Sequence, residues 1–359
     1  MPGAVAAEPT IPIGICQSTA QGPAKFATAL LKGAQLSVDT FNAAGGAKGR
    51  KIEIIPLDIG NNDPSQARLS FTKGIEVDKI VALICWGTNV MAQNGPIVDG
   101  AGVAAFAMSQ GLNVPKKSKF TQQLEAITTM QCRVTAKYTK ENFPNVKRLA
   151  VLYVNYEFGI EIRDQCQIEF GKVGIEMVAS EGHPNAPTDL RAQTTKLLEA
   201  KPDAIFLAPI GGGTIPLGIR AGRELGYTGL YMTTSAGDTS DVYTFKLAEK
   251  DFFFVAHDIP ASAPAALKDV AAAYGGYAAA GYEYGWLVGK LANDLTAAGQ
   301  PVNGQGIIDK IRGVNTVETP LNTYVFKKDG DTVRPLGIFG VNGGARKLLK
   351  AYSAKDLAE

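Results

Sequence analysis

Short apolar runs alternate with stretches of amphipathic helical pattern along most of the chain. Most of these runs are continuously apolar and do not alternate between apolar and polar residues. This is typical of parallel strands that helices cover on both faces. The pattern predicts strands at residues 11–15, 52–57, 80–84, 103–107, 149–154, 175–179, 204–208, 230–233 and 252–256.

Helical signals lie between the predicted strands. Asp63-Pro64 places an N-cap residue before a proline at the first helical position, and Thr188-Asp189 opens a second helical segment. The long segment 264–298 predicts two helices that break at Gly275-Gly276. A further helix is indicated by apolar residues at helical spacing, namely Phe26, Leu30, Ala34, Val38 and Phe41.

Strands that alternate with helices indicate βαβ units and a parallel sheet. The series pauses at 113–119 and then restarts, which predicts an α/β fold of two doubly wound lobes. Two short strand signals at 323–327 and 336–339 have no helix between them, so we expect them at a hinge or a sheet edge. Ligands of such sheets lie beyond the carboxyl ends of the strands, and two facing lobes place the site in the cleft between them.

Composition narrows the classes of function. Hydrophobic residues make up 45% of the 359 residues and charged residues 19%, which excludes a disordered chain. Lys and Arg number 36 against 34 Asp and Glu, so no basic excess exists to bind nucleic acid. No run reaches the ~18 apolar residues of a membrane span. No intact signal peptide is expected, although Ala4-Val5-Ala6-Ala7 in the tail at 1–9 resembles either the end of one or an ordinary Ala-rich tail.

Four cysteines are too few and too dispersed for a disulfide scaffold, and no Cys-x-x-Cys pair occurs. We therefore expect Cys16, Cys85, Cys132 and Cys166 to be buried free thiols. One alternative stays open, because Cys16 and Cys85 end strands that are neighbours in the predicted first sheet, so that a bridge between them is possible.

Signals for catalysis are weak. Nucleotide-binding motifs are absent, and residues 107–111 form an AxSxG variant of the serine-hydrolase elbow that no helical pattern follows. His183 falls in a predicted solvated loop, and His257 follows a predicted strand near the hinge, so neither is marked as a base. We therefore expect no enzyme, no cofactor and no metal, and interpret Ser109 as a hydrogen-bond donor at a strand end. A serine hydrolase built on Ser109 is kept as a remote alternative.

Residues 42–53 read NAAGGAKGRKIE, and Asp58 and a DPSQA segment at 63–67 follow. This order resembles the N-terminal signature of the type I solute-binding proteins of the leucine/isoleucine/valine-binding family. The likeness extends over about residues 10–345. Further segments that resemble the family, in order, are residues 18–23, 156–159, 200–206, 221–226 and 281–284.

The resemblance implies a clamshell of two lobes that closes around a small ligand. It assigns 10–121 plus 255–322 to the N-terminal lobe and 122–254 plus 323–359 to the C-terminal lobe. The three crossovers between the lobes are expected near 120–123, 254–256 and 321–326.

The resemblance also implies a periplasmic or lipid-tethered receptor that delivers its ligand to the membrane permease of an ABC importer and catalyses nothing. We expect a monomer without a membrane span or a nucleic-acid partner. A cytoplasmic ligand-sensing regulator with the same clamshell is the alternative from another class.

Two loops match the family's carboxylate-binding positions. Thr88 and Asn89 fall where a hydroxyl group and backbone N–H groups hold the ligand's carboxylate, and both are residue types that favour the start of a helix, here the one that follows. Ser109 and Gln110 fall on the second carboxylate-binding loop. Gly211 falls near a position where family members often have tyrosine, so that contact is expected to be lost.

The remaining positions bear on the class of ligand. Ser235 falls where amino-acid receptors of the family have an acidic residue for the α-ammonium, and Asp238 is the closest substitute unless it caps the helix expected near residue 240. Four aromatic residues are candidate pocket walls: Phe26, Trp86, Phe158 and Tyr277. For Trp86 and Phe158, ordinary core packing is the alternative. We therefore favour a carboxylate ligand without an α-amino group, such as an aromatic acid, over a branched-chain or aromatic amino acid held by Asp238.

Overall fold

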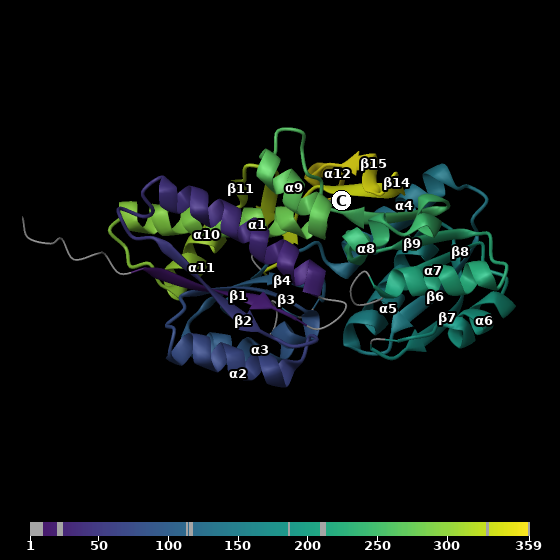
Figure 1. Cartoon of the computed structure of the whole chain (residues 1–359), viewed down its shortest axis with the longest axis horizontal. Helices are drawn as coiled ribbons and strands as arrows, with labels where there is room; N and C mark the ends of the chain where they lie inside the picture. Colours follow the sequence, from purple (N-terminus) through teal and green to yellow (C-terminus); the bar gives the residue numbers. More distant parts are fainter. Residues whose placement is uncertain are drawn as a thin grey trace, which may run out of the picture.

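The computed structural model describes residues 10–19, 24–112, 114, 118–185, 187–208, 213–327 and 330–357. These residues form two α/β lobes that lie side by side, each with a parallel-dominated sheet at its centre (Figure 1). The predicted fold class is confirmed.

The first lobe contains a five-stranded parallel sheet in the order β2-β1-β3-β4-β5. The strands are β1 (Ile11–Gln17), β2 (Ile52–Asp58), β3 (Ala82–Trp86), β4 (Ala104–Met108) and β5 (Thr121–Gln123). Every residue of β3 and β4 is buried, as expected for central strands covered on both faces, and the three residues of the edge strand β5 are buried as well. The helices are α1 (Ala24–Ala43), α2 (Pro64–Glu76), α3 (Thr88–Ala101), α9 (Ala265–Tyr274), α10 (Tyr277–Ala297) and α11 (Gly304–Arg312).

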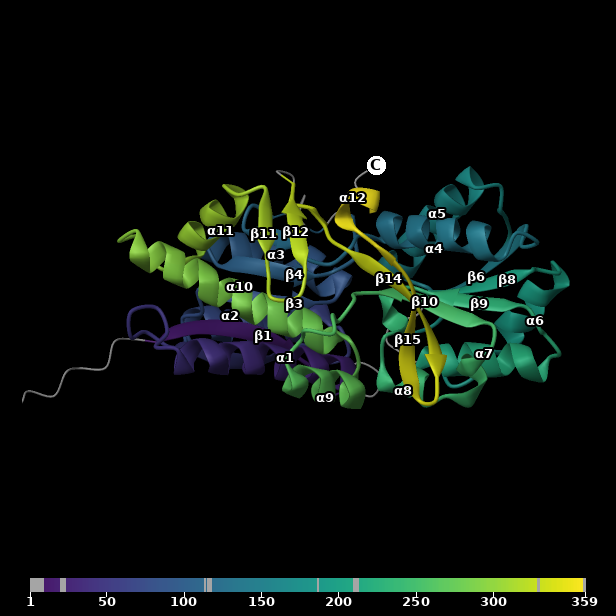
Figure 2. The same ribbon diagram turned by 90° about the horizontal axis from the view of Figure 1, so that it is seen from above.

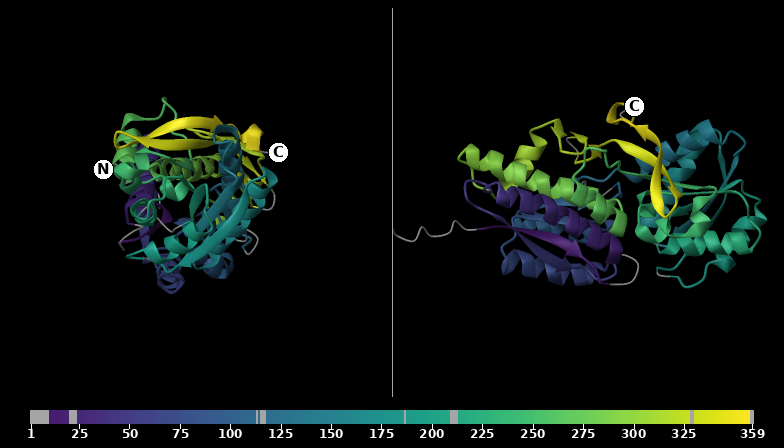
Figure 3. Two further views of the ribbon diagram at one scale, coloured as in Figure 1. Left: turned by 90° about the vertical axis from the view of Figure 1, so that its right-hand side faces the viewer. Right: turned by 45° about the horizontal axis from the view of Figure 1, so that its top comes forward.

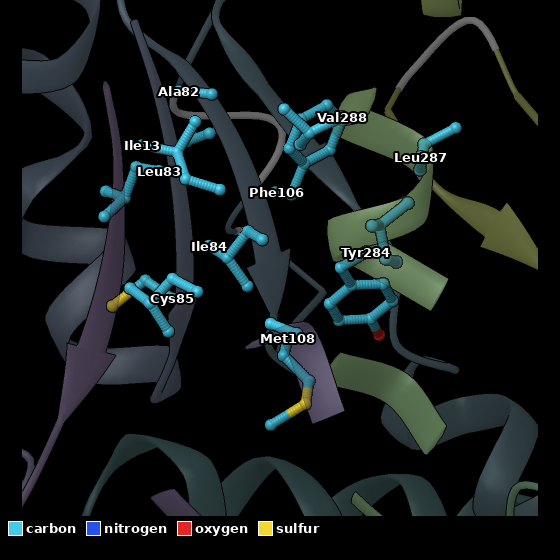
Figure 4. Packing of buried hydrophobic residues seen from close by; sticks show 14 of the residues in the cluster. Ile13, Ala82, Leu83, Ile84, Cys85, Phe106, Met108, Tyr284, Leu287 and Val288 are labelled. Atoms are coloured by element: carbon cyan, nitrogen blue, oxygen red, sulfur yellow. The ribbon is translucent and has the colours of Figure 1, made fainter. Parts of the chain in front are cut away.

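Helices α1 and α10 pack on one face of this sheet, with α2 and α3 on the other (Figure 1). Phe106 of β4 and Val288 of α10 belong to the same buried core (Figure 4). Helices α1 and α10 approach each other backbone to backbone: a Cβ atom on Gly33 would lie 1.9 Å from the carbonyl oxygen of Ala278. A larger residue at Gly33 would therefore force the two helices apart.

The second lobe contains a seven-stranded sheet in the order β15-β14-β10-β9-β8-β6-β7. Its strands are β6 (Arg148–Val154), β7 (Glu176–His183), β8 (Ala204–Ala208), β9 (Leu230–Thr233), β10 (Phe252–Ala256), β14 (Leu336–Asn342) and β15 (Ala345–Tyr352). Strands β6 to β10 pair in parallel, whereas β14 and β15 run antiparallel at one edge.

Helices α4 and α5 cover one face of the second sheet, and α6 and α7 cover the other (Figure 2). The helices are α4 (Thr128–Asn142), α5 (Glu157–Lys172), α6 (Arg191–Glu199), α7 (Thr214–Glu224), α8 (Ser240–Tyr243) and α12 (Ala354–Leu357). Two short 3-10 turns, η2 (Ser235–Gly237) and η3 (Lys246–Glu249), lie beside α8 in the sequence.

The chain passes three times from one lobe to the other. A small antiparallel sheet of β11 (Thr316–Glu318), β12 (Thr323–Phe326) and β13 (Thr332–Val333) lies at the last passage. Figure 3 shows these connections between the lobes. The buried core changes lobe between Leu124 and Ala126, between Ala256 and Ala263, and between Phe326 and Val333.

The prediction of free thiols is wrong, because the structure contains two disulfides and all four cysteines are paired. Cys16 of β1 and Cys85 of β3 lie on adjacent strands, with their Cα atoms 4.8 Å apart. Cys132 of α4 and Cys166 of α5 lie on packed helices with a Cα separation of 4.9 Å. Each bridge lies within one lobe. The alternative of a bridge between Cys16 and Cys85 on neighbouring strands is confirmed, whereas the pairing of Cys132 with Cys166 was not predicted.

The prediction of a solvated loop at His183 is also wrong. His183 is the last residue of β7, is buried, and donates through Nδ1–H to the carbonyl oxygen of Pro184 at 2.7 Å. Burial lowers the pKa of His183, which favours the neutral ring.

Within the described ranges, no helix is both long and apolar enough to cross a membrane. The same part of the chain contains no group of three or more His, Cys, Asp or Glu residues that could hold a metal ion.

Candidate functional site

A cavity lies between the lobes, beyond the carboxyl ends of the strands of the first sheet. Its void is about 640 Å³, open solvent at the mouth included. Both lobes and the first crossover contribute side chains to it, as the topology of facing α/β lobes predicts. The lining residues are Phe26, Asn62, Trp86, Gly87, Thr88, Met108, Ser109, Gln110, Glu125, Phe158, Ala236, Thr239 and Tyr277.

Aromatic rings form the apolar part of the cavity. The ring of Phe26 lies 5.0 Å from that of Trp86 and 4.3 Å from that of Tyr277, centroid to centroid, and is nearly perpendicular to both. The indole Nε1–H of Trp86 donates to the carbonyl oxygen of Cys16 at 3.2 Å, which fixes the orientation of the ring. Phe158 lines the cavity from α5 of the second lobe. These edge-to-face contacts hold the rings in defined positions before any ligand binds.

Hydrogen-bond donors gather where β3 and β4 end. The hydroxyl oxygens of Thr88 and Ser109 lie 3.0 Å apart, and the backbone N–H of Gly111 donates to the Ser109 hydroxyl at 3.3 Å. Thr88 is the first residue of α3, and no side chain caps this helix. The first N–H groups of a helix have no partner within it and favour an anion. This corner of the cavity is therefore suited to a carboxylate.

The backbone at Gly87 brings α3 to this corner. Gly87 has φ +91°, a conformation that residues with a side chain rarely adopt, and a Cβ atom there would lie 2.0 Å from Oδ1 of Asn62. The glycine thus allows the chain to turn directly from the end of β3 into α3.

The two lobes touch each other through Ser235. Its hydroxyl oxygen accepts a hydrogen bond from Gln110 Nε2 at 2.8 Å and another from the Tyr277 hydroxyl at 2.9 Å. Burial, and then the nearby carboxylate of Glu125, raise the pKa of Tyr277, so that its hydroxyl stays a neutral donor. Gln110 and Tyr277 belong to the first lobe and Ser235 to the second, so these hydrogen bonds join the two lobes beside the cavity.

Glu125 and His257 form an ion-pair-type contact at the hinge side of the cavity. Glu125 lies at the first passage between the lobes and His257 at the second, and both are 1% exposed. Nε2 of His257 lies 2.7 Å from Oε2 of Glu125. Because a carboxylate only accepts hydrogen bonds, the imidazole is the donor.

Asp238 interacts with an arginine and a tyrosine that do not line the cavity. Its Oδ2 lies 2.7 Å from Nη1 of Arg346, and its Oδ1 accepts a hydrogen bond from the Tyr243 hydroxyl. Asp238 is buried but is not among the lining residues of the cavity.

The structure brings most of the predicted site residues together. Seven of them line the cavity: Phe26, Trp86, Thr88, Ser109, Gln110, Phe158 and Tyr277. Ser235 contacts two of these from behind, whereas Asn89 and Asp238 are not in the lining. Gly211 lies outside the described residues.

Sequence reasoning missed several lining residues, among them Asn62, Gly87, Glu125 and Thr239. Asn62 and Gly87 follow β2 and β3, so the rule that ligands lie beyond strand ends could have found them. Glu125 follows β5, which has three residues and was not predicted.

The hydroxyl of Ser109 has partners other than a base. It contacts the Thr88 hydroxyl and the Gly111 N–H, whereas His257 pairs with Glu125 and His183 with a backbone carbonyl. Neither histidine of the chain is hydrogen-bonded to Ser109, so the Ser–His contact of a hydrolase is not formed here.

The family model described as periplasmic binding protein matches residues 10–346. An amino acid binding protein from Pseudomonas aeruginosa is 24% identical over 89% of this chain and 85% of its own length. A crystal structure of a leucine binding protein from Thermotoga maritima has a TM-score of 0.84, 18% identity, and coverage of 97% and 100% of the two chains. A solute binding protein of an ABC transporter from R. palustris in complex with 4-hydroxybenzoate has a TM-score of 0.83, 17% identity, and coverage of 97% and 98%.

Proposed function

This chain belongs to the periplasmic binding protein family, the binding receptors of ABC transporters, and from that premise we propose that its ligand is a small aromatic carboxylate without an α-amino group. The receptor closes on this ligand between its lobes and delivers it to the permease of an ABC importer.

The observation that carries the proposal is a donor-rich corner that faces a set of aromatic rings. Thr88 and Ser109 supply hydroxyl groups beside the uncapped start of α3, and Phe26, Trp86 and Tyr277 supply flat apolar surface. No lysine or arginine occurs among the described lining residues. Neutral donors and the helix terminus would therefore hold the carboxylate, and the rings would pack against the rest of the ligand.

The residues expected to hold an α-ammonium favour this choice. Ser235 has no charge, and its hydroxyl oxygen already accepts two hydrogen bonds. Asp238 is paired with Arg346 and does not line the cavity. A buried ammonium group without a carboxylate partner would be costly to desolvate. A similar protein from R. palustris was crystallised with 4-hydroxybenzoate, which shows that this fold accepts aromatic acids.

An amino acid is the second candidate ligand, and Glu125 is the observation that favours it. Its carboxylate lines the cavity and could accept an ammonium group in place of Asp238. Two of the similar proteins have names that specify an amino acid or leucine.

A binding panel separates the two candidates. Calorimetry and thermal shift on the purified protein would use benzoate, 4-hydroxybenzoate, a phenylpropenoate, leucine and phenylalanine. We expect the aromatic acids to bind and to raise the melting temperature. Binding of the amino acids alone would overturn the aromatic-carboxylate proposal and leave the receptor assignment in place.

The disulfides support a location outside the cytoplasm. Disulfides persist in oxidising compartments such as the periplasm and are rare in the cytosol, and each lobe contains one. We infer a monomeric receptor that is free in the periplasm or tethered to lipid. Release of the native protein by osmotic shock would support this location, whereas retention with the cytosolic fraction would favour a ligand-sensing regulator.

A further inference from the structure

Glu125 differs from the rest of the cavity wall in its charge. Among the described residues that line the cavity, it is the only carboxylate, and no lysine or arginine accompanies it there. Its side chain is 1% exposed, so water contributes little to its solvation. A buried carboxylate needs hydrogen-bond donors, and those around Glu125 can be counted.

The donors present leave part of the carboxylate unsatisfied. Oε1 accepts from the backbone N–H of Ala126 at 3.0 Å, and Oε2 accepts from Nε2 of His257 at 2.7 Å. A carboxylate has about four acceptor positions. About two positions therefore remain for a group inside the cavity.

The cavity wall has one further unpartnered group that can only accept. Oε1 of Gln110 is buried without a hydrogen-bond partner among the described residues, and so is the hydroxyl of Thr239, which can donate or accept. The Tyr277 hydroxyl donates to Ser235 and is not free to donate to Glu125. A ligand group that contacts Glu125 or Oε1 of Gln110 must bring its own hydrogen, because an unpartnered buried acceptor costs free energy.

From this geometry, and resting on the proposed function, we propose that Glu125, oriented by His257, accepts a hydrogen bond from a hydroxyl group on the ring of the carboxylate ligand. The ligand class is thereby narrowed from aromatic acids in general to hydroxylated aromatic acids.

The sheet order places the two polar ends of such a ligand at different strands. The donor corner follows β3 and β4, whereas Glu125 follows β5 at the edge of the sheet. Adjacent strands are about 4.8 Å apart, so one to two strand spacings separate the two ends. An aromatic ring can bridge this separation, with the carboxylate at Thr88 and Ser109 and the hydroxyl at Glu125.

A hydroxyl group suits Glu125 better than an ammonium group does. His257 already supplies a donor to Glu125, and it is buried with no hydrogen-bond partner among the described residues at its other ring nitrogen. The buried guanidinium of Arg334 already interacts electrostatically with Glu125, so a second buried cation here would be less favourable. A hydroxyl group adds a donor and no charge.

The first test uses the unmodified protein and pairs of ligands that differ in one donor. Calorimetry compares 4-hydroxybenzoate with 4-fluorobenzoate, and 3-hydroxybenzoate with 3-fluorobenzoate; fluorine is small but has no hydrogen to donate. A hydrogen bond to a charged group predicts that at least one hydroxylated acid binds roughly tenfold or more tightly than its fluorinated partner. This comparison needs no variant and therefore does not depend on a variant's ability to fold.

The second test uses Glu125→Gln, with Glu169→Gln as the matched control. Glu169 is also a buried glutamate, but it pairs with Arg133 and Lys172 in the second lobe and does not line the cavity. We expect Glu125→Gln to reduce the hydroxyl preference to within about threefold, because neutral hydrogen bonds are roughly half as strong as charged ones. Glu169→Gln should keep the preference of the unmodified protein.

The outcomes separate this inference from the proposed function. Equal binding of hydroxylated and fluorinated acids, or a preference that survives Glu125→Gln, would overturn the role of Glu125 and leave an aromatic-acid receptor. Failure of every aromatic acid to bind would overturn both. Binding of leucine that is lost in Glu125→Gln and kept in Glu169→Gln would show that Glu125 accepts an ammonium group, which also overturns the inference.

Discussion

Thr88→Val tests the anion-binding corner most directly. The substitution removes the hydroxyl that lies 3.0 Å from the Ser109 hydroxyl and keeps the shape of the side chain. Shape matters here, because a Cβ atom on Gly111 would lie only 2.3 Å from Cγ2 of Thr88, which shows how closely the methyl group packs. Valine preserves this contact, whereas alanine would remove it together with the hydroxyl.

The expected loss of affinity follows from the contact that is removed. A hydrogen bond to a charged group contributes about 1.5–3 kcal/mol, which is roughly a ten- to 150-fold change in Kd. Binding should be weakened and not abolished, because the N–H groups at the start of α3 remain.

Calorimetry with benzoate on the unmodified protein, Thr88→Val and Thr88→Ser measures this effect. Thr88→Ser keeps the hydroxyl and should bind within about threefold of the unmodified protein, since only apolar contact is lost. Undiminished binding by Thr88→Val would refute a contact between this hydroxyl and the ligand. A loss in Thr88→Ser as large as that in Thr88→Val would show that the methyl contact contributes as much to binding as the hydroxyl does.

Three further predictions concern the disulfides, the closure and one buried histidine. Unfolded, unreduced protein should take up no alkylating reagent, because all four cysteines are paired. Replacement of both Cys16 and Cys85 by alanine opens a loop of 69 residues and should lower the free energy of unfolding by about 4 kcal/mol in a urea titration. An unchanged midpoint of the titration would contradict this. Small-angle scattering should show a smaller radius of gyration with saturating benzoate, and an identical profile would speak against hinge closure. Burial lowers the pKa of His183, so as the pH drops below the unfolded-state pKa of about 6.5 the unfolded chain takes up a proton before the folded chain does. The free energy of unfolding therefore decreases as the pH is lowered through this range. His183→Gln should flatten this loss between about pH 7 and 5, and an unaltered slope would assign it to other groups.

The sequence predicts the elements whose signals are local. The break at Gly275-Gly276 separates α9 from α10, and Asp63-Pro64 precedes α2, with Asp63 accepting hydrogen bonds from the first N–H groups of that helix. Buried parallel strands were also found, because continuous apolar runs identify them. β15 was not, because its ARKLLKAY segment has mostly exposed, charged or aliphatic positions at the sheet edge.

Contacts between distant segments could not be predicted in the same way. Glu125 has no surrounding motif, and its partner His257 is 132 residues away on another crossover. Asp238 was a candidate ligand contact because of its position after a strand, yet Arg346 of β15 neutralises it. The disulfide partners are neighbours only because β1 lies beside β3 and α4 beside α5. Each of these contacts depends on which segments become neighbours in the folded protein, and a local sequence pattern does not encode this.

The way in which the lobes share the chain has a consequence for its synthesis. Helix α1, near the beginning of the chain, packs on α10, which ends at Ala297. The edge of the second sheet is formed by β14 and β15, which come last in the chain. A nascent chain that has emerged only to β10 therefore contains neither complete lobe, since domains fold as units once their partners are present. Both lobes therefore become complete only while the last quarter of the chain is made, with α10 for the first lobe and β14 and β15 for the second.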